Sequence, residues 1–139
     1  SHLGGNMLFL WLFGVVVGEL CGWRWMLAAF LLPTIGGSIG QLLLDPESPI
    51  PGLGASGGVM GLEGFYFGLA FLHPRPSSHV WPLARPVNST QLAAAGVVGV
   101  GLDFLGLMGP ASNVGHGAHI GGFITGMLLS TLANRFIPR

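Results

Sequence analysis

The chain alternates between long apolar stretches and short segments rich in proline, glycine and charged residues. Each apolar stretch has close to the ~20 residues that a helix needs to cross ~30 Å of hydrocarbon. Strands are disfavoured as spans, because a sheet edge exposed to lipid leaves backbone groups unpaired, whereas a helix pairs its own. The pattern therefore predicts one all-α domain over residues 1–139, a polytopic transmembrane helical bundle with helices at 3–18, 25–44, 53–72, 91–108 and 118–137.

Composition supports a protein embedded in the lipid bilayer. Hydrophobic residues make up 50% of the chain and charged residues 7%, against about 25% charged residues in a typical soluble domain. The formal net charge of +0 and the lack of a basic run argue against a nucleic-acid partner. A single cysteine, Cys21, excludes a disulfide framework within the chain.

The arginines indicate how the helices are oriented. If the five segments alternate in direction, every arginine falls on the same side of the membrane, and the positive-inside rule makes that side cytoplasmic. The loop that holds Asp45 and Glu47 then faces outward. We expect a multi-pass integral membrane protein, which in a prokaryote would lie in the plasma membrane. The arginines that carry this argument are Arg24, Arg75, Arg85, Arg135 and Arg139.

Two glycine-containing motifs each place one reactive side chain near the outer end of an apolar segment. Ser56 lies in Gly54-Ala55-Ser56-Gly57, and His119 lies in Gly117-Ala118-His119-Ile120-Gly121-Gly122. At ~1.5 Å per residue, Ser56 is ~28 Å above Arg75 and His119 is ~24 Å above Arg135. A serine hydroxyl is a poor nucleophile until a neighbouring base takes its proton. The matched depths therefore predict a serine–histidine pair that performs hydrolysis in the outer part of the bilayer.

Small residues indicate that the Ser56 and His119 segments pack against each other. Membrane helices approach closely where Gly, Ala and Ser form a stripe along one face. We expect the third and fifth segments to pack along such stripes, with packing of each stripe against some other helix as the alternative. The stripes are Gly57, Gly61, Gly64 and Gly68 on the third segment, and Ala118, Gly122, Gly126 and Ser130 on the fifth.

Other ionisable residues are further candidates for a role in the chemistry. Asp103 could complete a Ser-His-Asp triad with His119, but we expect a two-residue dyad, because the sequence does not place Asp103 beside the imidazole ring. His116 and His119 are spaced as a metal pair could be, yet no third ligand and no His-Glu-x-x-His motif accompany them. Glu63 follows Ser56 on the same helix face, and we expect a hydrogen-bonding structural acid, with a role in substrate or water access as the alternative.

Three other classes of protein fit the sequence poorly. The formal Gly54-x-Ser56-x-Gly58 match would need a preceding strand in a soluble α/β-hydrolase sheet. An intramembrane aspartyl protease would need two aspartates at one depth, whereas Asp45 lies in a predicted loop. A transporter would need paired intramembrane charges along a path.

The motifs resemble those of the rhomboid intramembrane serine proteases over nearly the whole chain. His2 with Asn6-Met7-Leu8, then Leu10-Trp11 and Phe13-Gly14, is similar to the second membrane helix of that family. The Ser56 and His119 motifs resemble its fourth and sixth helices. The resemblance implies a six-helix core of which five helices are present, so that the sequence is a fragment that starts at the second transmembrane helix.

The resemblance also implies the chemistry. Ser56 would be the nucleophile and His119 the base, while the backbone N–H of Ser56 and the side chains of His2 and Asn6 would stabilise the oxyanion. The reaction that the resemblance implies is endopeptidase cleavage of transmembrane protein substrates near the outer face of the lipid bilayer, without a cofactor or a bound metal. The alternative is a catalytically silent rhomboid-like protein that binds membrane helices as a chaperone or trafficking factor. Neither interpretation fixes an oligomeric state.

Overall fold

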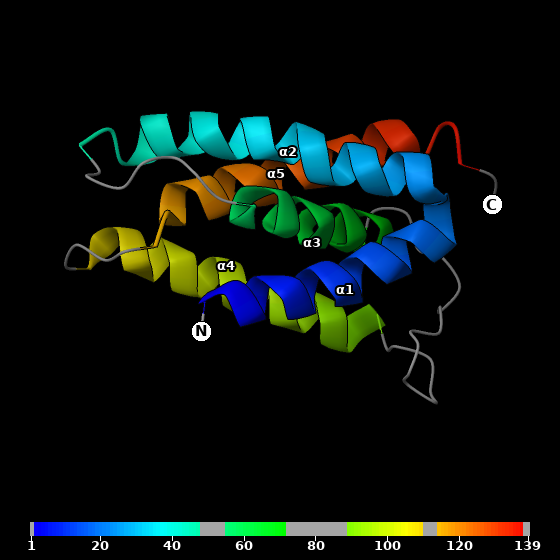
Figure 1. Ribbon diagram of the computed structural model, residues 1–139, viewed down its shortest axis with the longest axis horizontal. Helices are drawn as coiled ribbons and strands as arrows, with labels where there is room; N and C mark the ends of the chain where they lie inside the picture. The colour runs from blue at the N-terminus through cyan, green and yellow to red at the C-terminus, as the bar shows by residue number, and fades with distance from the viewer. Residues whose placement is uncertain (1, 48–54, 72–88, 110–113, 138–139) are drawn as a thin grey trace.

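The computed structural model describes residues 2–47, 55–71, 89–109 and 114–137. Within these ranges the chain forms five α-helices that run the length of one bundle (Figure 1). The all-α architecture predicted from hydropathy is thus confirmed. The helices are α1 His2–Cys21, α2 Trp23–Leu44, α3 Ser56–Phe71, α4 Ser89–Met108 and α5 His116–Ala133.

Successive helices alternate in direction, so that α1, α3 and α5 run one way and α2 and α4 return (Figure 1). The ends of the helices differ from the predicted ones by a few residues. α1 continues to Cys21, because Gly22 alone, at φ 85°, turns the chain into α2. α3 begins at Ser56, after a turn at Ala55, and α5 ends at Ala133, where turns replace the helix.

α3 is the central helix of the bundle. It packs against each of the other four helices, and most of its residues are buried, including Phe65 and Leu69. Its glycines allow α5 to approach backbone to backbone. A Cβ added to Gly126 of α5 would collide with the carbonyl group of Gly61, and one added to Gly122 would collide with the carbonyl group of Gly57. The expected contact between the two glycine stripes is therefore confirmed.

α2 covers a second face of α5 in the same manner. A Cβ on Gly40 would lie 2.6 Å from the carbonyl oxygen of Gly117, and a Cβ on Gly37 would lie 2.7 Å from that of Ala118. Carbon atoms at such distances overlap sterically, so only glycine fits. The outer half of α5 is thus packed closely between α2 and α3, and its side chains have little room to move.

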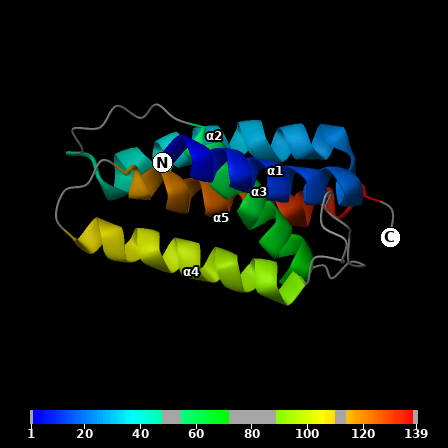
Figure 2. The same ribbon diagram turned by 60° about the horizontal axis from the view of Figure 1, so that its bottom comes forward.

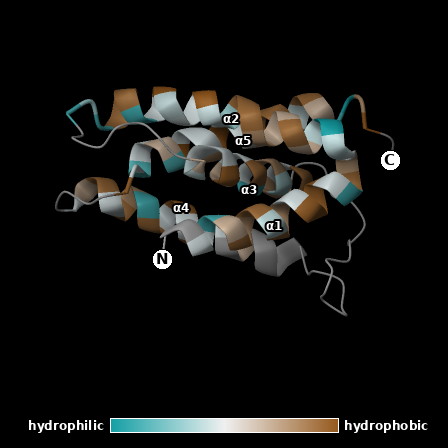
Figure 3. Cartoon of the chain, viewed as in Figure 1, coloured by the Kyte–Doolittle hydropathy of each residue, from teal (hydrophilic) through white to brown (hydrophobic). Residues whose placement is uncertain are grey.

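The outer surface of the bundle is apolar. Large hydrophobic side chains are exposed along α2 and α4, among them Leu31, Ile35, Leu102 and Leu105, and the hydropathy colouring places apolar residues on these outer helices (Figure 3). By length and composition, Gly4–Cys21 and Trp23–Leu44 can each cross a membrane. Such a surface is suited to contact with lipid.

The polar ends of the bundle agree with the orientation inferred from charge. Arg24 begins α2 and Arg135 follows α5, so both lie at the end where α1 and α5 finish (Figure 1). Asp45 follows α2 at the opposite end. Arg75, Arg85 and Arg139 lie outside the described residues.

Replacing Gly126 by alanine tests the close approach of α3 and α5. The new methyl group must push the Gly61 backbone away, and overpacking of this kind costs about 1–3 kcal/mol of folding free energy. Thermal unfolding of the purified protein in mild detergent should show a lower midpoint for Gly126→Ala. The control is Gly18→Ala in α1, where a Cβ would meet no atom within 4 Å and where alanine favours the helix. Equal midpoints for the two variants would contradict the contact.

Candidate active site

Ser56 is the first residue of α3 and is partly exposed at the outer end of the bundle. The next residue, Gly57, begins the contact with α5, since a Cβ there would lie 3.4 Å from the carbonyl oxygen of Ala118. His119 directly follows Ala118 in α5. The structure therefore brings Ser56 and His119 to the same end of the α3–α5 contact, as their counted depths predicted.

The two nitrogens of the His119 ring have different surroundings. Nδ1 lies 2.8 Å from Oδ1 and 2.9 Å from Oδ2 of Asp103. Nε2 is buried and has no hydrogen-bond partner among the described residues, Ser56 included. One ring nitrogen is thus held by a carboxylate, while the other keeps its hydrogen-bonding capacity unused.

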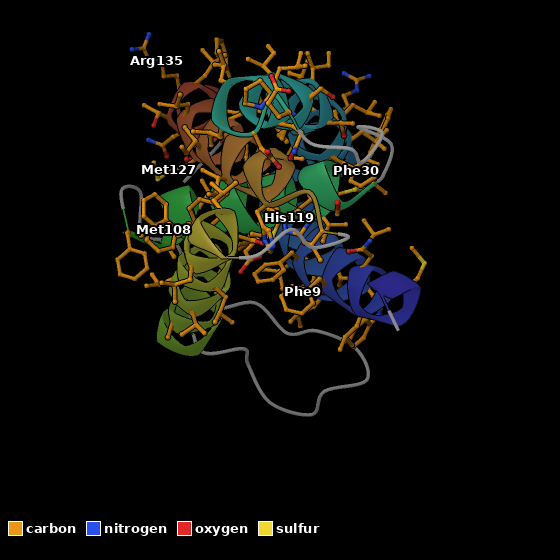
Figure 4. All side chains as sticks on the ribbon, turned by 90° about the vertical axis from the view of Figure 1, so that its left-hand side faces the viewer. Phe9, Phe30, Met108, His119, Met127 and Arg135 are labelled. Atoms are coloured by element: carbon orange, nitrogen blue, oxygen red, sulfur yellow. The ribbon has the colours of Figure 1, made fainter. Side chains whose placement is uncertain are left out.

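Asp103 reaches His119 from α4, and its Oδ1 also lies 2.8 Å from Nδ1 of His116. The sequence had left the position of Asp103 relative to the His119 ring open, and the structure brings the two side chains into contact. The carboxylate is placed by the outer half of α4, where Gly106 lies directly against the His116 ring. His119 extends from α5 toward α4 in the view along the bundle (Figure 4).

A sequence signal for this contact was present. Gly96, Gly99, Asp103 and Gly106 are spaced by three, four and three residues, so they share one face of α4. The large hydrophobic residues of α4 lie elsewhere on the helix and are exposed. An acid in a small-residue stripe is expected to face a neighbouring helix, because the stripe is where helices approach.

The Asp103–His119 geometry has a chemical consequence. A carboxylate only accepts hydrogen bonds, so Nδ1 of His119 must carry the proton that it shares with Asp103. In a neutral imidazole the other nitrogen then has a free lone pair. Nε2 is therefore able to accept a proton from a nearby hydroxyl group, and the carboxylate would stabilise the imidazolium that forms.

The Asp103 carboxylate lies beside two histidine rings. Asp103 Oδ1 is within hydrogen-bond distance of both Nδ1 atoms, His116 and His119. In the described ranges, no group of three or more His, Cys, Asp or Glu side chains has an arrangement that could hold a metal ion.

Gln41 supports the histidine-bearing end of α5 and was missed by the sequence reasoning. The backbone N–H of Ala118 donates to Oε1 of Gln41 at 3.0 Å, and Gln41 Nε2 donates to Oδ2 of Asp45 at 3.2 Å. The first N–H groups of a helix have no partner within that helix. Gln41 of α2 therefore caps α5 one residue before His119.

The expected oxyanion donors are placed only in part. The side chain of His2 lies outside the described residues, and Asn6 is half-buried on α1. α1 and α3 run in parallel, with Gly14 beside Leu62 and Phe13 beside Tyr66, a register that puts Asn6 near the level of Ser56. The backbone N–H of Ser56 is in the first turn of α3, where N–H groups are free of intrahelical partners.

Glu63 does not behave as the hydrogen-bonding structural acid that we expected. Its residue is 1% exposed, but neither carboxyl oxygen has a hydrogen-bond partner in the part of the chain that the structure describes. The side chain lies against Gly96 of α4. Glu63 is thus a buried carboxyl group that no described residue satisfies.

The family model of the Rhomboid domain matches residues 1–136. The chain belongs to the rhomboid family. Rhomboid proteins are integral membrane proteins, which agrees with the apolar helices and the lipid-facing surface. No solved structure matches the chain with significance.

Two curated rhomboids are similar to the chain. RHOMBOID-like protein 12, mitochondrial, of Arabidopsis thaliana is 30% identical over 139 residues, covering 88% of this chain. Rhomboid protein 1, mitochondrial, of Saccharomyces cerevisiae is 29% identical over 142 residues, covering 99% of this chain. The chain spans 39% of the length of each of these relatives.

Removing the Gln41 side-chain amide tests the cap on α5. In Gln41→Leu the partly buried Ala118 N–H would lose its acceptor, and an unsatisfied buried donor costs about 1–3 kcal/mol. Thermal unfolding in detergent should therefore show a clearly lower midpoint. Ser38→Ala, one turn earlier on α2, removes an exposed hydroxyl that donates only to Thr34 within its own helix, and its midpoint should stay at the wild-type value. A Gln41→Leu midpoint equal to that of Ser38→Ala would refute the cap.

Proposed function

We propose that this rhomboid is an intramembrane serine endopeptidase in which Ser56 is the nucleophile, His119 the general base and Asp103 the group that orients His119. One observation carries the proposal. At the end of the α3–α5 contact that begins with Ser56, His119 keeps a buried and unused Nε2 while its Nδ1 is held by Asp103. A histidine held in this tautomer is suited to deprotonate a serine.

The reaction follows from these positions. Nε2 of His119 takes the Ser56 proton as Oγ attacks the carbonyl carbon of the scissile peptide bond. The protonated imidazole, paired with Asp103, then gives that proton to the leaving amine, and an acyl-enzyme is left on Ser56. A water molecule loses a proton to Nε2 and attacks the ester, and Ser56 regains its proton as the carboxylic acid leaves.

The negative charge of each tetrahedral intermediate needs hydrogen-bond donors. The backbone N–H of Ser56 is one, and the positive end of the α3 dipole lies at the same point. The His2 and Asn6 side chains would complete the oxyanion hole from α1. A donor of this kind is worth roughly 3–4 kcal/mol in the transition state.

The substrate would be a transmembrane protein that enters from the lipid and unwinds near the outer face. Ser56 begins α3 at that end of the bundle, where Asp103 contacts His119. α4 is an outer helix that packs against α3 and α5 (Figure 2). Displacement of α4 would therefore admit a helix from the bilayer to Ser56.

A catalytically silent rhomboid that binds membrane helices is the second candidate. Retention of both Ser56 and His119 favours the enzyme, because binding alone requires neither a nucleophile nor a base. The unused Nε2 of His119 argues in the same direction, since a purely structural histidine would be expected to satisfy both nitrogens.

Covalent labelling tests the nucleophile. Purified protein in detergent should react with a fluorophosphonate probe at Ser56, with the modified peptide identified by mass spectrometry, because only a serine activated by a base attacks the phosphorus atom. Ser56→Ala and His119→Ala should each abolish labelling. Ser38→Ala, which removes a hydroxyl group on the exposed surface of α2, should label like the wild type. Persistent labelling of Ser56→Ala, or no labelling of the folded wild type, would eliminate the protease and favour the silent binder.

A change at Asp103 tests its orienting role. Asp103→Asn keeps the shape but allows its amide to donate to His119, which would favour the wrong tautomer, so kcat should fall by ~10²-fold or more while KM changes little. Cleavage of a single-span substrate in proteoliposomes gives both constants, and thermal unfolding checks the fold. If the kcat of Asp103→Asn stays within about threefold of wild type, an effect below 1 kcal/mol, Asp103 has no orienting role and the mechanism uses a two-residue dyad.

A further inference from the structure

Glu63 is a buried carboxyl group that the proposed reaction does not use. It is 1% exposed, and both of its oxygens are without a partner among the described residues. Leaving a polar group unpaired in an apolar environment is unfavourable, and ionisable residues at membrane depth are therefore rare and often functional. The position of Glu63 suggests what could bind it.

The carboxyl group lies against the backbone of α4. A Cβ on Gly96 would be 3.1 Å from Oε1 of Glu63 and 3.6 Å from Cε2 of Phe123, and a Cβ on Gly99 would be 3.8 Å from the same Oε1. The backbone N–H groups in the interior of α4 are engaged in its own helix. α4 thus covers the carboxyl group without offering it a donor at these glycines.

Glu63 shares a helix face with the candidate nucleophile. It follows Ser56 by seven residues, or about two turns, which places it ~10 Å deeper along α3. α4 covers this face from the lipid side (Figure 2), and its own outward residues, among them Val97, Val98 and Leu102, are exposed. A helix that displaced α4 to reach Ser56 would therefore meet Glu63 as well.

We propose that Glu63 determines substrate specificity by accepting a hydrogen bond from a donor side chain, such as an asparagine amide, in the membrane segment of the substrate. The inference rests on the proposed function, since it needs a substrate bound at Ser56. A distance of ~10 Å corresponds to about three extended residues or about seven helical residues. The donor should lie three to seven residues from the scissile bond, on the side that runs deeper into the membrane.

The experiment uses a single-span substrate with a leucine-rich segment, reconstituted with the protease in proteoliposomes. One asparagine is moved through each position from two to nine residues beyond the scissile bond, and kcat/KM is measured for every substrate. A matched series carries glycine, which weakens the helix but has no side-chain donor. The enzymes are wild type, Glu63→Gln and Glu63→Leu. The matched control is Glu19→Leu, which removes an exposed acid near the C-terminal end of α1.

With wild type and Glu19→Leu, one asparagine position within the predicted window should raise kcat/KM by about 3- to 10-fold over glycine at that position, the range of a single hydrogen bond. Glu63→Gln, which keeps an acceptor oxygen, should retain much of this gain. Glu63→Leu should lose it and still cleave the glycine series as wild type does, which shows that the variant is folded and active.

Two results would overturn the assignment. An asparagine gain that persists in Glu63→Leu would come from helix unwinding alone, and no gain over glycine in wild type would mean that Glu63 binds water only. If wild type cleaves the substrates and labels at Ser56, either result removes the role of Glu63 and leaves the proposed function intact. If wild type neither cleaves nor labels, both proposals fall together.

Discussion

The structure depends on the backbone contact between α3 and α5, in which Gly57, Gly61 and Gly64 meet Gly122, Phe123 and Gly126 without intervening side chains. In a bilayer, apolar side chains gain nothing by leaving lipid for another helix, so close van der Waals packing has to supply the attraction. The same contact fixes the relative height of the two helices. Because Ser56 begins one helix and His119 lies in the first turns of the other, the packing that stabilises the bundle also aligns the two residues proposed to react.

The proposed site is assembled from three successive helices, and each contributes a different kind of group. α3 supplies the hydroxyl group and a free backbone N–H, α5 the imidazole, and α4 the carboxylate that holds its Nδ1. α2 contributes no reacting group, but Gln41 caps α5 beside His119. The helical framework therefore leaves the imidazole few alternative orientations, as a preorganised base requires.

Much of this arrangement could be predicted from the sequence, and the parts that could not have a common cause. Hydropathy and arginine placement gave the helices and their directions, and depth along the membrane normal placed Ser56 level with His119. The direction in which each residue faces around its helix was harder to predict, because residues such as Leu102 and Leu105 are apolar whether they face lipid or protein. The sequence therefore did not place Asp103 beside His119, although α4 brings them together. Glu63 was expected to form a hydrogen bond, but its carboxyl oxygens have no partner among the described residues, and Gly96 and Gly99 of α4 lie beside it. The contact of Gln41 was not predicted because its partner is a backbone N–H group, which no residue type in the sequence identifies.

The attachment of α4 has a mechanical consequence. Its hydrogen bonds to His116 and His119 are made by Asp103, toward the outer end. Farther in, Gly96 and Gly99 lie beside Glu63 of α3 and have no side chains of their own. If the Asp103 hydrogen bonds persist while α4 is displaced, the residues of α4 farther from Asp103 move more than Asp103 does. α4 could then leave Glu63 open to a substrate helix while the His119 ring keeps its orientation.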